Sequence, residues 1–223
     1  MMKKLTFAAL LLASALPLAA QNWSFGASAG PFVFGDFYER RLRPGTEQGP
    51  AGQQTLTLSA ATRAGLALDL ERSLGDRWAI RAEGTLTRAP LTIRQKGDSD
   101  GVELDAGEMD VSTFMLPVVF RLNPRGTFRF HALAGPALAV YRLEGRDNAS
   151  GAEPAFEGTQ LEWGFAFGGG VAWWVSDRFA IEGNLTDTIT TSPFDEESFP
   201  SAGSLEISRP HNVHTTIGVR WRF

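Results

Sequence analysis

Apolar and polar residues alternate with a period of two along most of this chain. Near its end, Val213, Ile217 and Trp221 fall on one side of the pattern, whereas His214 and Arg220 fall on the other. Successive residues of a β-strand point to opposite faces, so the pattern predicts strands with one apolar face and one polar or small face. Eight such segments are expected, at about 22–34, 55–72, 78–94, 109–122, 127–143, 160–176, 178–191 and 210–223.

The connections between these segments alternate in length. Three are short and carry the Gly, Pro, Asn and Asp residues of tight turns, at 74–77, 123–126 and 176–178. Four are long and rich in Gly, Pro, Ser and acidic residues, at about 35–54, 95–108, 144–159 and 192–209. Three tight turns and four long loops predict an all-β fold, an eight-stranded antiparallel up-and-down barrel that crosses a membrane, with both termini at the tight-turn end.

The first twenty residues have the pattern of a secretory signal peptide. Lys3 and Lys4 precede an apolar run over 5–16, and small residues follow at Ala19 and Ala20. The run is shorter than the roughly 20 apolar residues of a membrane-spanning helix. We therefore expect a signal peptide at 1–20 and a barrel domain at 21–223. Without the two lysines, 19 basic residues (21 − 2) oppose 25 acidic ones, for a net charge of −6.

The composition excludes several kinds of site. The chain has no cysteine, so disulfides, thiolate metal ligands and cysteine nucleophiles are ruled out. No basic stripe suggests nucleic acid. The three histidines have no metal-ligand spacing, and the acidic run at 98–110 is best interpreted as a solvated loop. We expect neither a metal ion nor a cofactor.

The polar face of the strands carries six basic and five acidic residues. They are Arg63, Asp69, Glu71, Arg81, Glu83, Arg121, Arg129, Glu162, Glu182, Arg220 and Arg222. An eight-stranded barrel has an interior just wide enough for side chains to fill. If this face points inward, the nearly balanced charges predict a paired network that closes the lumen. The alternative is a soluble barrel on which these charges are solvated.

Aromatic residues gather near both ends of the expected strands. Near the tight turns lie Trp23, Trp78, Phe128, Trp173 and Phe179, and near the long loops lie Phe34, Phe37, Tyr38, Phe114, Tyr141 and Trp163. Two belts of this kind are typical of rings that settle at the two membrane interfaces. Core packing is the alternative, because aromatic residues favour strands in general. We also expect Trp221 and Phe223 to serve as the C-terminal signal for barrel assembly.

Four stretches together resemble one known family. They are 114–120 before a tight turn, 128–137 after it, 165–174 with its glycines, and the final Phe223. In order and spacing the chain is similar to the outer-membrane β-barrel domain family, porin-family proteins of the OmpA/OmpX-like size class. The resemblance implies a monomer in the bacterial outer membrane. Its partners would be outer-membrane lipid, the barrel-assembly machinery with periplasmic chaperones, and an extracellular ligand of the long loops.

Three functions remain open at this stage. The first, which we favour, is a non-enzymatic integral barrel with a closed lumen and four extracellular loops, in a structural, adhesion or interaction role. The second is an enzyme that modifies lipid A or phospholipid, with His211 near Ser208 at the rim, or His214 with Glu162, in a Ser/His/acid arrangement. The third is a soluble periplasmic barrel that resembles lipocalins.

Overall fold

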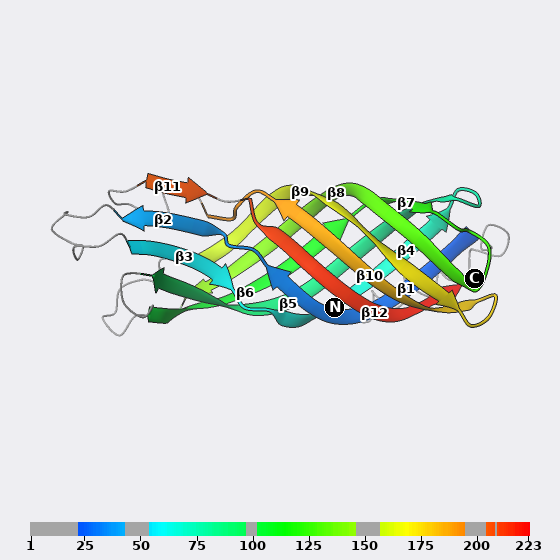
Figure 1. The fold of residues 1–223 in the computed structure, drawn as a ribbon, viewed down its shortest axis with the longest axis horizontal. Helices are drawn as coiled ribbons and strands as arrows, with labels where there is room; N and C mark the ends of the chain where they lie inside the picture. Colours follow the sequence, from blue (N-terminus) through cyan, green and yellow to red (C-terminus); the bar gives the residue numbers. More distant parts are fainter. Residues whose placement is uncertain (1–21, 43–53, 97–101, 146–156, 195–203, 208) are drawn as a thin grey trace, which may run out of the picture.

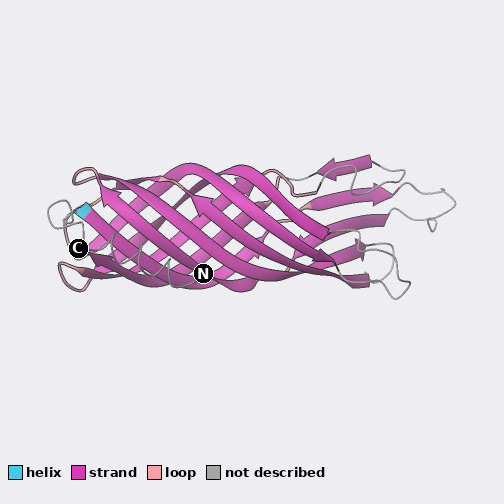
Figure 2. Ribbon diagram, turned by 180° about the vertical axis from the view of Figure 1, so that it is seen from behind, coloured by secondary structure: helices cyan, strands magenta, loops and turns pink. Residues whose placement is uncertain are grey.

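A computed structural model gives the architecture of the chain, and it describes residues 22–42, 54–96, 102–145, 157–194, 204–207 and 209–223. Nearly all of these residues are in strands (Figure 2). No helix among them has the length and apolarity that crossing a membrane requires.

Twelve strand segments follow one another along the chain. In the first half they are β1 (Trp23–Phe34), β2 (Tyr38–Leu42), β3 (Gln54–Ala60), β4 (Arg63–Ser73), β5 (Trp78–Lys96) and β6 (Val102–Met115). In the second half they are β7 (Val118–Arg121), β8 (Phe128–Gly145), β9 (Glu157–Trp174), β10 (Phe179–Thr190), β11 (Ser204–Ile207) and β12 (His211–Arg222).

Eight strands close into a single antiparallel barrel (Figure 1). Neighbours in sequence are neighbours in the barrel, and β1 pairs with β12 to close the ring. One of the eight strands is built from β6 and β7 in succession, because both pair with β5 and β8. The predicted fold class and the eight predicted strands are therefore confirmed.

The pairing continues beyond the barrel at the long-loop end. After a break at 35–37, β2 pairs with β3 and β11, which continues the pairing of β1 with β4 and β12. Figure 1 shows β2, β3, β11 and the ends of β5 and β6 projecting from one end of the barrel. The predicted loops at 35–54, 95–108 and 192–209 were thus wrong in part, since each contains paired strand residues.

The barrel turns its apolar side outward. Leu66 and Leu68 on β4, Phe165 on β9 and Ile217 on β12 are exposed, whereas Glu71 and Arg220 at inward positions are buried. A soluble barrel has the opposite arrangement, because water selects polar residues for its outer wall. An apolar outer wall around a polar interior is what a bilayer selects, so the soluble alternative does not fit this structure.

Local sequence explains two of the three tight turns. Gly126 has a φ of 111°, in the region that favours glycine, and it follows Asn123, whose amide donates to the Phe128 carbonyl at 2.6 Å. In the third turn, the Ser176 hydroxyl accepts hydrogen bonds from the backbone N–H groups of Arg178 and Phe179. These polar side chains satisfy backbone groups that the sheet leaves free at its end.

Pro117 explains why the fourth strand is built from two segments. Proline has no N–H to donate to the sheet, and the ladder breaks between Met115 and Val118. Gly135 on β8 lies against this break, and a Cβ placed on it would lie 2.5 Å from Pro117 Cα and 2.6 Å from the Leu116 carbonyl oxygen. The wall is therefore closely packed where Gly135 meets Pro117.

Gly135→Ala should destabilise the barrel by about 1–3 kcal/mol, because the added methyl group displaces the backbone of the neighbouring strand. Gly84→Ala is the matched control, since a Cβ at Gly84 has no atom within 4 Å. Urea unfolding in lipid vesicles would give both free energies of unfolding. Equal values for the two variants would contradict this close packing.

Candidate functional site

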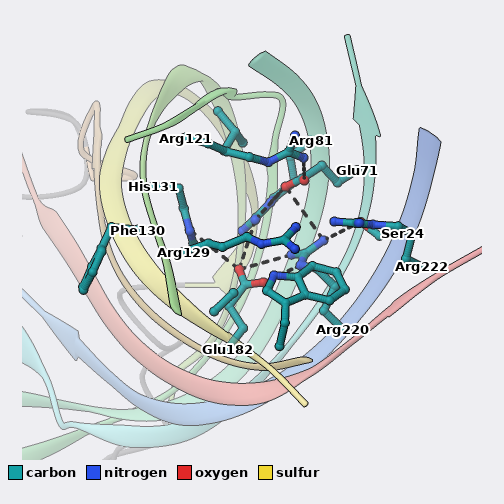
Figure 3. Close-up of a pocket in the computed structure, with 13 residues that line it drawn as sticks. Ser24, Glu71, Arg81, Arg121, Arg129, Phe130, His131, Glu182, Arg220 and Arg222 are labelled. Atoms are coloured by element: carbon teal, nitrogen blue, oxygen red, sulfur yellow. Dashed lines mark hydrogen bonds and ion pairs between the residues drawn. The ribbon is translucent and has the colours of Figure 1, made fainter. Parts of the chain in front are cut away.

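A buried cluster of charges fills the lumen in the half next to the tight turns (Figure 3). Its cations are Arg81 of β5 and Arg220 of β12, and its anions include Glu71 of β4 and Glu182 of β10. Arg81 donates to Glu71 at 2.7 Å and pairs with Glu182 at 3.0 Å. Arg220 donates to Glu182 and pairs with Asp69 of β4 at 2.8 Å. The two arginines thus share the same carboxylates.

The pair between Arg81 and Glu182 joins opposite walls. In the order of the eight strands, β5 and β10 are four places apart, which is half the circumference. Arg220 adds a further contact to the wall, because its guanidinium donates to the Ser24 hydroxyl of β1 at 3.1 Å. The cluster therefore crosses the lumen and does not merely line it.

A glycine leaves room for one of the carboxylates. A Cβ on Gly26 of β1 would lie 2.0 Å from Asp69 Oδ2, so any larger residue would displace that side chain. Asp69 lies 3.8 Å from Arg81 as well as 2.8 Å from Arg220. Small residues on the inward face thus make space for long charged ones on neighbouring strands, as a narrow lumen requires.

Two histidines extend the cluster. His131 of β8 lies 3.0 Å from the Asn184 amide oxygen and 3.7 Å from Glu182. His214 of β12 stacks on Phe32, with ring centroids 4.9 Å apart, and its Nε2 lies 3.5 Å from Glu83. Neither is placed beside Glu162, which instead accepts a hydrogen bond from Thr191. The Ser/His/acid arrangement suggested for His214 and Glu162 is therefore not formed.

The eleven predicted lumenal charges occupy three places. Asp69, Glu71, Arg81, Glu83, Glu182 and Arg220 make up the buried cluster. Arg121, Arg129 and Arg222 lie at its edge, towards the tight turns, where Arg121 donates to Glu71 at 2.5 Å. Arg63 is exposed at the first residue of β4, and Glu162 contacts Thr191 at the end of β10. The last two lie outside the cluster.

The half of the lumen next to the long loops holds an apolar core instead. Phe37 is fully buried, and its ring meets Tyr141 and Phe194 edge-on at 6.1 Å and 5.8 Å. The Tyr141 hydroxyl in turn accepts from the Asn212 amide at 2.7 Å. Further buried members of this core include Phe32, Phe34, Leu58, Leu91, Met109 and Leu143.

This apolar core corrects part of the expected second belt. Phe34, Phe37 and Tyr141 point into the lumen, whereas Phe114 and Trp163 are exposed on the outer wall. The alternation rule assigned apolar residues to the outer face, and it therefore missed a lumen that is itself apolar at one end. The sequence does carry a signal for this apolar core. Phe32 and Phe34 alternate in phase with Ser24 and Gly26, so all four residues lie on the inward face of β1.

The residues expected at the tight-turn belt lie on the outer wall. Trp78, Phe128 and Trp173 are exposed, and Trp23 and Phe179 are half-buried. Rings pack across neighbouring strands, with Trp78 against Phe120 at 4.7 Å. Trp221 and Phe223 also face outward, and their expected role in assembly is not tested by their position.

Within the described ranges, no group of three or more His, Asp or Glu side chains is arranged to hold a metal ion. The carboxylates of the cluster are instead close to guanidinium groups. The arrangement holds opposite charges together across a narrow space and offers no vacant ligand set.

A closed eight-stranded barrel with an apolar outer wall and a polar interior defines the small outer-membrane β-barrels, and this chain has their fold. It is similar to the outer membrane protein OprG from Pseudomonas aeruginosa, with a TM-score of 0.60 and 11% identity over 92% of this chain and 98% of that one. Neisserial surface protein A gives a TM-score of 0.51 and 10% identity over 90% and 97%. No family model and no curated protein matches the sequence. Both neighbours share the fold of this chain.

Glu182→Gln should lower the free energy of unfolding by about 3–5 kcal/mol, because it removes one of the carboxylates that the two buried guanidinium groups share. Asp177→Asn, in an exposed turn at the same end, is the matched control and should change stability by less than about 0.5 kcal/mol. Urea titration of the refolded protein in vesicles measures both. If Glu182→Gln were as mild as the control, the cluster would not stabilise the barrel.

Proposed function

We propose that this protein is a non-conducting outer-membrane barrel that acts through its external surface, in an adhesion or interaction role. The observation that carries the proposal is the filling of the lumen. The ionic cluster occupies the half next to the tight turns, and the apolar core around Phe37 occupies the half next to the long loops.

The two layers block ions in different ways. An ion in the lower layer would have to separate Arg81 from Glu182, which are already within 3.0 Å. In the upper layer it would have to lose its hydration among Phe37, Tyr141 and Phe194, which offer few polar groups in exchange. A cavity beside the ionic cluster has a volume of only about 20 Å³, which is room for about one water molecule.

Refolded protein in a planar bilayer should show no measurable single-channel conductance. A heat-denatured sample of the same preparation and a refolded open porin provide the negative and positive controls. The proposal of a sealed lumen would be wrong if the intact protein conducted steadily at low voltage while the denatured sample did not.

The projecting strands are the surface that we propose for interaction. With short turns towards the periplasm, as is usual for such barrels, the end bearing β2, β3 and β11 faces outside the cell. Phe37 and Leu58 anchor this region, because the Phe37 N–H donates to the Leu58 carbonyl at 3.0 Å and both side chains are buried. A loop supported by paired strands presents its surface more rigidly than an unsupported one.

Replacing 39–56 by a short Gly–Ser turn would remove most of β2 and the start of β3 from this projection and keep Phe37 and Leu58. The variant should retain heat-modifiable migration on gels, because the closed barrel is untouched. Cells that display it should lose the adhesion to extracellular-matrix proteins that cells displaying the intact protein show. Unchanged adhesion would argue against this role for the projecting strands.

One contact favours the enzymatic alternative. His211 Nδ1 lies 2.8 Å from Asp187 Oδ2 on the outer wall near the extracellular rim, and the imidazole is half exposed. An aspartate in this position can orient a histidine as a general base. The expected neighbour Ser208 lies outside the described residues.

If this pair acts on lipid, His211→Gln and Asp187→Asn should each abolish a change in lipid A or phospholipid composition that the intact protein produces. Mass spectrometry of membranes from cells expressing each form would detect it. His131→Gln, at a lumenal histidine remote from the rim, is the control. Identical lipid profiles with and without the intact protein would eliminate the enzymatic alternative.

A further inference from the structure

The mouth of the barrel at the tight-turn end is strongly basic. It encloses about 650 Å³ and is lined by five arginines and one carboxylate, that of Asp76. The arginines are Arg72, Arg121, Arg125, Arg129 and Arg222. Arg77 and Arg178 lie in the turns around it, and Asp177 is the other carboxylate there. The surplus of positive charge therefore has no counterpart among the described residues of this end.

These arginines differ in how many hydrogen bonds and ion pairs they already make within the protein. Arg121 is fully engaged, because it donates to Glu71, Ser73 and the carbonyls of Gly75 and Asp76. Arg125 pairs with Asp76 at 3.3 Å. Both tie the turns together, and Arg121 has little left to offer a ligand.

Arg129 and Arg222 are held in another way. Both guanidinium groups lie on the indole ring of Trp174, at 4.6 Å and 4.1 Å from its centroid. Arg129 makes one further bond, to the Gly126 carbonyl. The Arg222 guanidinium has no hydrogen bond or ion pair among the residues that the structure describes. Stacking fixes the plane of a guanidinium and leaves the N–H donors at its edge available.

Like charges held this close repel each other unless an anion lies between them. Glu71, a buried carboxylate that lines the same small cavity as both arginines, already pairs with Arg81 and Arg121. Figure 3 shows Arg129 and Arg222 beside the cluster that contains Glu71 and Glu182. The guanidinium groups of Arg129 and Arg222 are held in fixed planes and keep unused N–H donors. Such groups can bind a carboxylate or phosphate through two parallel hydrogen bonds.

We propose that this mouth is a binding site for an oxyanion ligand, in which Arg129 and Arg222 contact the ligand and Trp174 holds them in place. The volume of the mouth admits a ligand with two or more phosphate or carboxylate groups. The ligand stops there, because the adjoining cavity shrinks to about 20 Å³ beside the ionic cluster. The site is a vestibule open to the periplasm and is independent of any activity at the opposite end.

Calorimetric titration of the refolded full chain in detergent at low salt tests the proposal, with inorganic pyrophosphate and citrate as probes. The intact protein should bind at least one of them, more weakly as salt is added. Arg129→Gln with Arg222→Gln should weaken binding about tenfold or more, because charge-assisted hydrogen bonds are lost. The affinity of Arg222→Lys should lie between those of the intact protein and the double variant, because lysine keeps the positive charge but cannot form bidentate hydrogen bonds.

Arg63→Gln is the matched control, because Arg63 is an exposed arginine at the other end of the barrel. Heat-modifiable migration shows that each variant is folded. Tighter binding of pyrophosphate than of citrate would indicate a phosphorylated ligand, and the reverse order would indicate a polycarboxylate. Either result supports the proposed site. The proposal is overturned if neither probe binds at millimolar concentration, if the double variant binds as well as the intact protein, or if Arg63→Gln weakens binding equally.

Discussion

Arg81 and Glu182 reach across the lumen from opposite walls, and their pairing explains why the interior can be both charged and narrow. A narrow lumen holds little water, so the charged side chains that point into it must find their partners inside the barrel. Arg220 joins this pair, and it shares three carboxylates with Arg81, those of Asp69, Glu71 and Glu182. A buried charge without such partners would strongly destabilise the fold. The filling of the lumen near the tight turns therefore follows from the need to satisfy its charges.

The two halves of the lumen are filled by side chains of different chemistry. Near the turns, opposite charges pair; near the loops, Phe37 and Phe194 enter from segments beyond the barrel strands and pack on Tyr141. The apolar half anchors the projecting strands to the rigid wall. The charged half ends at the basic mouth next to the tight turns. The filled interior thus separates two surfaces of different chemistry, one at each end of the barrel.

Alternation with period two predicted the eight strands because both faces of a spanning strand are under selection, by lipid outside and by the narrow lumen inside. The same parity correctly placed Glu182 and Arg220 on the inward face. It could not tell which charges meet, because contacts across the lumen depend on the stagger of the strands. Arg63 has inward parity but is exposed at the start of β4. Phe37 lies in the break at 35–37, where the alternation is reset, so parity could not place it in the lumen.

A double-mutant cycle between Arg81 and Glu182 tests whether the cluster couples opposite walls of the barrel. The free energies of unfolding of Arg81→Gln, Glu182→Gln and the double variant would be measured by urea titration in lipid vesicles. If the cluster acts as one cross-lumen unit, the double variant should be more stable than the sum of the single losses predicts, with a coupling of at least about 1.5 kcal/mol. Additive losses within about 0.5 kcal/mol would contradict the account, because they would show that the two residues stabilise the barrel independently.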